Sequence, residues 1–327
     1  MFGSSMHSAK LNIIYTITMK KELNQRTIVP KGTFNKISGK YCLATQNTLD
    51  WEVSEDLCSQ KPEICSNDLT LLLPTEMCEE IFLYVPAIDL VVSVSRVCKN
   101  WYDILRSRNF WFQKVKREGF QLSAVTEKRL AEEKDLGKAL LILQGLSCHL
   151  LGVNTNLIQN PSGQDGLNKW HVKHGGNGLD VENAPVGSNL IPEEAGLPTQ
   201  HCFVSSFTPC TRTQMIKLEN HKLQPWMIDI LQPKIKVSEW VSARFDCAAR
   251  STMKVKIFGS GTPVSYKQDW SSSTDGVERM EWYKMSLVAD HVEGLCAIKF
   301  TNTSTDEQFW AGHYGAKTAG SSVVLHV

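Results

Sequence analysis

Histidines, cysteines and glycine-rich segments are the parts of this sequence whose residue types could support catalysis or metal binding. His171 and His174 lie three residues apart in a glycine-rich turn, but the chain has no Cys-x-x-Cys pair to complete a zinc site. Gly259-Ser260-Gly261 is not followed by the Gly-Lys-Ser/Thr of a phosphate loop, and no Gly-x-Ser-x-Gly motif occurs. No cysteine has the histidine and acidic neighbours that mark a nucleophile. We therefore expect a non-catalytic protein with no metal or other cofactor.

Three aromatic residues have the sequence environment of exposed binding loops. Phe207 lies between two serines and Thr208-Pro209, and Phe309 follows a polar run over residues 305–308. Polar, turn-like flanks are more typical of a surface loop than of a buried strand. Trp310 is adjacent to Phe309, and consecutive side chains of a strand point to opposite faces, so at least one of this pair is expected to be exposed. Burial in the core is the alternative interpretation for these rings.

Length and charge exclude several classes of protein. The chain of 327 residues is long enough for two domains, each with its own hydrophobic core. Its 35 Lys and Arg against 34 Asp and Glu give a net charge of +1, which does not support nucleic-acid binding driven by bulk positive charge. The longest apolar runs are far shorter than the roughly 20 residues that span a bilayer, and residues 1–21 make a poor secretory signal. We expect a soluble, cytoplasmic protein with reduced cysteines, no membrane insertion and no nucleic-acid partner.

Residues 69–117 have the pattern of a small module of three short helices, preceded by a largely disordered arm over residues 1–68. Pro74 can open the first helix, and Pro86 ends it. Apolar residues then recur at steps of three and four, which predicts an amphipathic helix, at Leu90, Val91, Val94, Val97, Cys98, Trp101, Ile104 and Leu105. A third apolar segment covers residues 110–115. A module this small leaves apolar side chains without an internal partner, which indicates a protein interface; a private three-helix core is the alternative.

Helical and strand periods divide the rest of the chain. Residues 118–149 are predicted to be a helical linker, with one helix over 121–147 that acts as a spacer. Beyond it the period changes to two, as where Met253, Val255 and Ile257 alternate with lysines. Turn clusters separate such segments, and no helical pattern intervenes. We therefore predict an α+β multidomain protein with an N-terminal trihelical module, a helical linker and an antiparallel β-sandwich over residues 150–327.

The helical module closely resembles an F-box. The resemblance rests on Leu73-Pro74-x-Glu76, the apolar run over residues 81–85, Arg96-Val97-Cys98-Lys99-x-Trp101 and Phe110-Trp111. In that family, a trihelical module docks on the Skp-type adaptor of a cullin-RING ubiquitin ligase, and the remainder of the chain selects the substrate. The resemblance implies that the adaptor is bound by apolar residues of this module, namely Leu73, Pro74, Ile81, Leu90, Val94, Val97 and Trp101.

The second half of the chain resembles the F-box-associated domain of the sugar-recognising F-box proteins. The shared motifs occur in the family's order and include Asn160-Pro161-x-Gly163, His174-Gly175-Gly176-x-Gly178, Phe203-Val204-Ser205-Ser206-Phe207 and Gln308-Phe309-Trp310-Ala311-Gly312. The resemblance implies a sandwich of about ten strands whose end loops bind the inner chitobiose of high-mannose N-glycans. It also implies a role in ER-associated degradation, in which misfolded glycoproteins are marked for ubiquitination.

The family's glycan-binding residues match four positions of this chain, namely Phe207, Phe309, Trp310 and Ala311. Pyranose rings present an apolar C–H face that packs on an aromatic ring, while their hydroxyls need a few fixed polar partners. The best sugar binders have Tyr-Trp-Lys where this chain has Phe309-Trp310-Ala311, so a phenol and an ammonium donor are lost. Each lost donor to a buried hydroxyl costs about 0.5–3 kcal/mol. An F-box receptor whose sandwich binds a protein surface instead of a glycan therefore stays open as the alternative.

Overall fold

The computed structural model describes residues 73–274 and 276–327. The predicted N-terminal arm over residues 1–68 lies outside the described residues. The chain forms two compact units, which adjoin in the sequence between Phe110 and Trp111.

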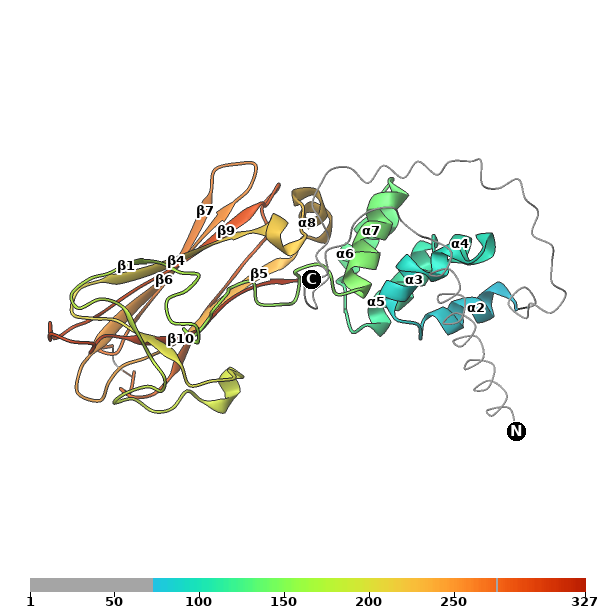
Figure 1. Cartoon of the computed structure of the whole chain (residues 1–327). Coiled ribbons are helices and arrows are strands. Elements are labelled where there is room, and N and C mark those ends of the chain that lie inside the picture. The colour runs from blue at the N-terminus through green and yellow to red at the C-terminus, as the bar shows by residue number, and fades with distance from the viewer. Residues whose placement is uncertain (1–72, 275) are drawn as a thin grey trace, which may run out of the picture. The chain divides into compact units, whose positions relative to one another are not determined.

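The first unit is built from short helices (Figure 1). Its elements are α2 (Thr75–Phe82), α3 (Ala87–Val92), the 3-10 helix η3 (Val94–Arg96), α4 (Lys99–Ile104) and the start of α5 (Arg108–Arg117). The buried Phe82 ring packs edge-on against Trp101 and Phe110, with ring centroids 5.1 and 6.5 Å apart. Edge-to-face packing of buried rings adds to the stability gained from their burial, so these three residues form the centre of the unit.

The single amphipathic helix predicted after Pro86 is interrupted twice, so this prediction is wrong. The backbone leaves helical geometry at Ser93 (φ −120°, ψ −54°) and at Cys98 (φ −157°, ψ 166°). Leu90 and Val94 are nevertheless fully buried, as their spacing predicts. The apolar period identified the buried face, but it carried no information about the two breaks.

The predicted single linker helix is likewise two helices, α6 (Ala124–Glu132) and α7 (Leu136–Ser147). The chain leaves the helical region at Glu133 (φ −58°, ψ 122°). The side chains of Ser123 and Asp135 each accept a backbone N–H three residues further on, at 3.1 and 3.2 Å. Such N-caps satisfy N–H groups that have no partner within the helix. Asp135 therefore caps the start of a second helix at a position where the sequence pattern had predicted one uninterrupted helix.

A short helix that the sequence did not predict joins the linker to the sandwich. It is α8 (Pro225–Leu231), which has proline at its first position and lies between β4 and β5 in the chain. The Thr126 hydroxyl on α6 donates to the Leu231 carbonyl at 3.1 Å, and the Lys138 ammonium on α7 lies 5.5 Å from the centre of the Trp226 ring. These contacts attach both linker helices to α8.

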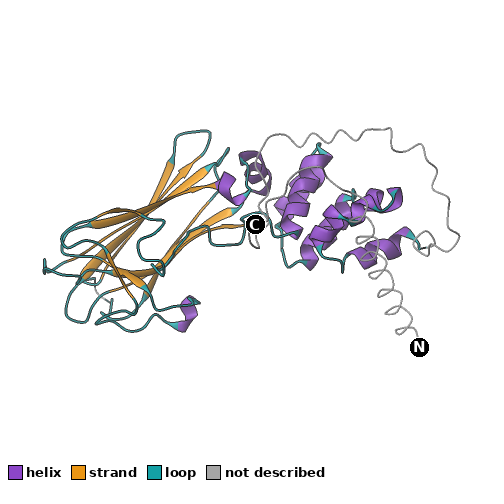
Figure 2. Ribbon diagram, in the orientation of Figure 1, coloured by secondary structure: helices purple, strands orange, loops and turns teal. Residues whose placement is uncertain are grey.

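The remainder of the second unit is a sandwich of two five-stranded antiparallel sheets, which confirms the predicted fold (Figure 2). The strands are β1 (His171–Lys173), β2 (Asp180–Glu182), β3 (Cys202–Val204), β4 (Cys210–Lys217), β5 (Lys234–Ser242), β6 (Ala249–Phe258), β7 (Val264–Ser271), β8 (Tyr283–Ala289), β9 (Ala297–Asp306) and β10 (Lys317–His326). One sheet has the order β1-β4-β9-β6-β7, and the other has the order β2-β3-β10-β5-β8. Two short 3-10 helices, η4 (Glu193–Ala195) and η5 (Leu218–His221), lie in the connections.

The inward faces of the two sheets bury the residues that the alternating pattern predicts. Met253, Val255 and Ile257 on β6 are fully buried, as are Ile298 and Phe300 on the neighbouring β9. Burial of each side chain of this size contributes about 1.5–3 kcal/mol to the stability of the folded state.

A charged pair also lies in this interior. Arg212 on β4 and Glu239 on β5 belong to different sheets, and their fully buried side chains form an ion pair. Ser321 donates to Glu239 at 2.6 Å and accepts from Arg212 at 3.0 Å, while the Asn302 amide donates to Glu239 at 2.7 Å. Burial lowers the pKa of Arg212, and the Glu239 carboxylate opposes that shift. The network therefore links the two sheets through groups that are stable only when paired.

Candidate functional site

Three loops meet at one end of the sandwich and carry the predicted glycan-binding residues. They are residues 174–179 between β1 and β2, residues 205–209 between β3 and β4, and residues 307–316 between β9 and β10. We call them the three site loops. The Asn177 backbone N–H donates to the Ser206 hydroxyl at 3.0 Å, and that hydroxyl donates to the Gly312 carbonyl at 2.6 Å. The Gly312 N–H donates to the Asn177 side chain at 2.8 Å, so the three loops are hydrogen-bonded to one another.

The structure brings together the aromatic residues of these loops. The rings of Phe207 and Phe309 lie 5.6 Å apart, and Trp310 packs edge-on against Tyr314, also at 5.6 Å. Phe309 is 72% exposed and Trp310 is 42% exposed, while Phe207 is half-buried. The expectation that polar flanks place these rings in a loop rather than in the core is confirmed. Both rings of the adjacent pair are exposed, because neither residue lies in a strand.

A buried carboxylate that the sequence did not single out holds the aromatic loop in shape. Asp306, the last residue of β9, accepts the backbone N–H groups of Phe309 at 2.8 Å and of Trp310 at 3.0 Å. Its own N–H donates to the Ser206 carbonyl at 3.1 Å. Phe309 has a φ of +63°, a left-handed conformation that is costly for a bulky residue. The two bonds to one carboxylate stabilise that conformation, so Asp306 sets the direction in which both rings project.

Replacement of Asp306 by alanine is expected to lower the free energy of unfolding by about 1–3 kcal/mol, because two N–H groups lose their acceptor. Release of the positive φ at Phe309 should also make the loop more accessible to proteases. Urea unfolding and limited proteolysis measure the two effects. Asp306→Asn is the matched control, since it keeps one acceptor oxygen and should lose less than the alanine variant. Equal stability of all three proteins would show that the carboxylate does not hold the loop.

Glycines in the first site loop make room for the second. A Cβ atom on Gly176, which has a φ of +56°, would lie 2.9 Å from the Phe207 ring and 2.7 Å from the Ser206 hydroxyl. A Cβ atom on Gly175 would lie 2.4 Å from the Pro209 carbonyl oxygen. These distances are closer than side chains tolerate, so the Gly175-Gly176 pair allows the backbone of the first site loop to approach the second.

Charged and polar groups border the aromatic rings on one side. The Arg244 guanidinium lies 4.8 Å from the centre of the Tyr314 ring and forms an ion pair with Asp246 at 2.9 Å. The hydrogen bond from Arg244 lowers the pKa of the Asp246 carboxyl. Next to this pair, burial raises the pKa of Cys247 to about 11, so its thiol stays protonated at neutral pH and donates to the Gln308 side chain at 3.0 Å. Ala311 is exposed and has no polar side chain to contribute.

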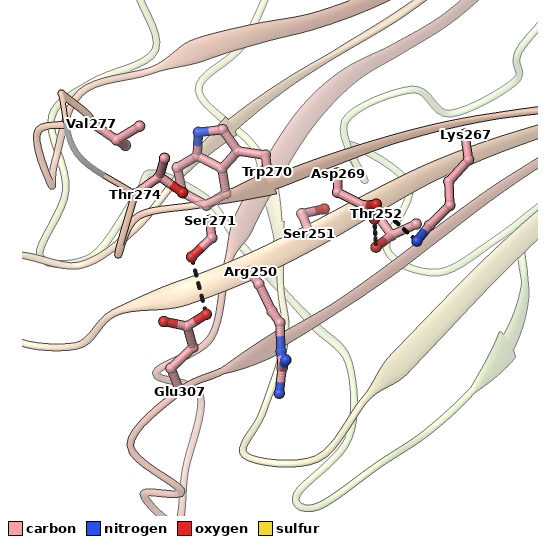
Figure 3. Close-up of a pocket in the computed structure, with 10 residues that line it drawn as sticks. All are labelled: Arg250, Ser251, Thr252, Lys267, Asp269, Trp270, Ser271, Thr274, Val277 and Glu307. Carbon is pink, nitrogen blue, oxygen red and sulfur yellow. Dashed lines mark hydrogen bonds and ion pairs between the residues drawn. The ribbon is translucent and has the colours of Figure 1, made fainter.

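A pocket of about 600 Å³ lies beside β6 and β7 (Figure 3). Glu307, the first residue of the third site loop, accepts a hydrogen bond from Ser271 at 3.0 Å there. At the other end of the pocket, Asp269 accepts from Thr252 at 2.6 Å and pairs with Lys267 at 2.8 Å. Most of the lining residues therefore have polar side chains, and Lys267 and Asp269 form an ion pair among them.

The predicted adaptor-binding residues differ in how deeply the helical unit buries them. Ile81, Leu90, Val94 and Trp101 are buried inside the unit, Leu73 and Val97 are half-buried, and Pro74 is exposed. Other large apolar side chains of the same unit are exposed, namely Met77, Tyr84, Ile88, Val92 and Tyr102. The buried residues thus support the helices, whereas the start of α2 and these exposed side chains are accessible to a partner.

The two histidines lie in different elements, His171 on β1 and His174 in the loop that follows it. The His174 ring nitrogen Nδ1 accepts the Leu179 N–H at 3.1 Å, and His171 is exposed on β1. Within residues 73–274 and 276–327, no three His, Cys, Asp or Glu side chains are grouped to hold a metal ion. The helices in these same ranges are all too short or too polar to cross a membrane.

The helical unit and the sandwich with its exposed aromatic loop define a modular receptor, with one part for docking and another for recognition. Residues 71–113 match the F-box domain, and residues 148–325 match the F-box associated region. The chain belongs to the family of F-box proteins that carry this associated region. Its domain architecture is therefore that of an F-box substrate receptor. The F-box implies partnership with the Skp-type adaptor and the cullin scaffold of an SCF ubiquitin ligase.

Relatives in this family match most of the chain. F-box only protein 27 of Mus musculus is 32% identical over 265 residues, which cover 78% of this chain and 90% of the relative. F-box only protein 17 of Homo sapiens is 30% identical, covering 78% and 92%, and F-box only protein 6 of Mus musculus is 28% identical, covering 77% and 82%. A solved carbohydrate-binding module in complex with β-1,4-galactotriose is 13% identical over 53% of this chain and 99% of its own, but the TM-score of 0.35 is too low to carry an argument.

Proposed function

We propose that this protein is the substrate-recognition subunit of an SCF-type ubiquitin ligase that binds misfolded N-glycosylated proteins for ubiquitination and degradation. The proposed ligand of the three site loops is the chitobiose core of high-mannose N-glycans. The proposed partner of the F-box is the Skp-type adaptor on its cullin-RING scaffold. In this account the chain acts in the cytoplasm as part of ER-associated degradation and contributes no catalytic group, because other subunits of the ligase transfer ubiquitin.

The observation that carries the glycan proposal is an aromatic platform made of the exposed Phe309 and Trp310 and of the half-buried Phe207, whose ring lies 5.6 Å from that of Phe309. Large exposed rings are unfavourable in water, and contiguous ones mark a binding site. The buried acceptor Asp306 fixes the two loop rings before any ligand arrives, and a preorganised site loses less entropy on binding. The apolar face of a pyranose ring is a suitable partner for such a platform.

Capture of a glycoprotein by the full chain tests this function. Ribonuclease B carries a high-mannose glycan, and ribonuclease A is the same polypeptide without it. We expect the immobilised full chain to retain ribonuclease B at least about tenfold better than ribonuclease A, and free chitobiose to release it. Equal retention of the two proteins would contradict glycan recognition.

A second candidate function is recognition of a protein surface by the same loops. Phe309 and Ala311 supply no side-chain donor, so within the platform only the Trp310 indole N–H can donate to a sugar hydroxyl. Exposed aromatic residues are also the common anchors of protein interfaces. Under this function, Trp310→Ala would weaken capture of a protein substrate whether or not its glycan had been removed.

The adaptor should depend on the start of α2. We expect the double variant Leu73→Ala with Pro74→Ala to reduce co-precipitation of the Skp-type adaptor at least about tenfold. Both side chains are at least partly accessible to a partner, and each substitution removes apolar surface that the adaptor would otherwise bury. Asn109→Ala, an exposed change on the same unit, is the control and should have little effect. Failure of the unmodified chain to recover the adaptor, or unchanged recovery by the double variant, would contradict this assignment.

A further inference from the structure

One face of the sheet β1-β4-β9-β6-β7 carries a cluster of lysines. Lys254 and Lys256 lie on β6, Lys267 lies on β7 and Lys299 lies on β9. The strand register places Lys254 directly opposite Lys267, and Lys256 directly opposite Lys299. Cross-strand partners share a face of a sheet, and so do alternate residues of one strand. All four side chains therefore project from the same face, and we call these four residues the lysine face.

The arrangement is unfavourable for the sheet by itself. Like charges directly opposite each other destabilise a strand pair, and two such pairs lie side by side here. Lys267 has an acidic partner, Asp269, at 2.8 Å. In the described part of the chain, no acidic side chain forms an ion pair with Lys254, Lys256 or Lys299. The positive charge of this face is thus left largely uncompensated.

The surroundings of the lysine face indicate which partner it fits. The residues opposite its members on the next strands are Thr301, Ser265 and Met215. Phe258, two residues after Lys256 on β6, places its ring 5.5 Å from the Lys256 ammonium, and no arginine lies among these neighbours. Protein interfaces rely on buried aromatic and arginine anchors and are depleted in lysine. The lysine face has the opposite composition, which favours an extended anionic surface over a protein partner.

We propose that the lysine face binds an anionic membrane surface, with the phosphate and carboxylate groups of lipid headgroups as its ligands. Neighbouring strands are about 4.8 Å apart, and alternate residues of a strand are about 7 Å apart. Neighbouring charges of the lysine face therefore lie within about one Debye length (about 8 Å) of each other at physiological salt and act together. Lysine is a mobile point charge that needs no bidentate geometry, which suits a fluid array of headgroups. Each lysine close to such a surface strengthens binding about fivefold. The proposal is independent of glycan recognition, since it uses a sheet face and not the three site loops.

Vesicle co-sedimentation of the full chain tests this proposal. The probes are vesicles of phosphatidylcholine alone and vesicles with about 30% phosphatidylserine, at about 0.1 M salt. The test variant is Lys254→Gln, Lys256→Gln and Lys299→Gln combined. The control combines Lys128→Gln, Lys236→Gln and Lys284→Gln, which removes the same charge from exposed positions elsewhere in the same unit.

We expect binding to the anionic vesicles only, with the partition coefficient lowered about hundredfold in the lysine-face variant and less than about threefold in the control. The circular dichroism spectra and thermal unfolding midpoints of both variants should match those of the unmodified chain, which verifies their folding. Absence of vesicle binding, or equal losses in the two variants, would overturn the proposal. Binding of soluble polyglutamate without binding of vesicles would overturn it as well and identify an acidic polypeptide as the partner.

Discussion

Replacing Trp310 by alanine is expected to weaken binding of ribonuclease B to the full chain at least about thirtyfold. The indole ring is exposed at the tip of the third site loop and packs edge-on against Tyr314, so it can offer a fixed apolar face to a pyranose ring. Truncation of an aromatic anchor at the centre of a binding site costs about 2 kcal/mol or more, which corresponds to that factor. Surface plasmon resonance with immobilised ribonuclease B measures the change.

The matched control for this variant is Trp226→Ala. Trp226 lies on α8, which comes after the C-terminal end of β4. The second site loop lies at the opposite, N-terminal end of the same strand, directly before Cys210. It is also a partly exposed tryptophan, so the control removes the same side chain at the other end of the sandwich. We expect an affinity within about twofold of the unmodified chain. Equal losses in both variants would show that the effect is general destabilisation and not loss of a binding ring.

The second large effect is expected in the sandwich interior, where Glu239→Gln should lower the free energy of unfolding by about 3–5 kcal/mol. The substitution keeps the size of the side chain and an oxygen that can accept from Asn302, but it leaves the buried Arg212 guanidinium without a counterion. Chemical denaturation followed by tryptophan fluorescence measures it, with Trp170 only 4.9 Å from the guanidinium as a nearby reporter.

Two further variants separate the buried charge from other causes. Combining Arg212→Met with Glu239→Leu removes both charges and should recover most of the lost stability, because apolar replacements of buried pairs are often neutral. Glu132→Gln breaks an exposed pair with Lys128 at 3.9 Å and should change stability by less than about 0.5 kcal/mol. A loss in the double variant as large as that of Glu239→Gln alone would contradict this interpretation of the network.

The sequence predicted the fold class and the interior faces of the strands, because alternation is a direct consequence of strand geometry. Met253, Val255 and Ile257 are examples, and all are buried. It did not predict where helices end. The breaks at Ser93 and Cys98 depend on local backbone geometry that the apolar period does not encode, and α8 is too short to show a helical period.

The candidate site was predicted in part for similar reasons. The polar flanks of Phe207 and Phe309 correctly indicated exposed loops, since these flanks are a local property of the sequence. The role of Asp306 was missed, because its carboxylate acts through backbone N–H groups in a turn whose shape only the structure reveals. The lysine face was also missed. Its lysines become neighbours only through the register between strands, and the apolar alternation within one strand does not show which residues lie opposite each other on the next.

Titration of the full chain with chitobiose, followed by isothermal calorimetry, tests the glycan assignment most directly, because it removes the protein part of the substrate. Glycan recognition by the platform requires saturable binding that is lost in Trp310→Ala and retained in Trp226→Ala. No heat of binding up to millimolar chitobiose would contradict glycan recognition by the platform of Phe207, Phe309 and Trp310, and it would leave an F-box receptor that binds a protein surface.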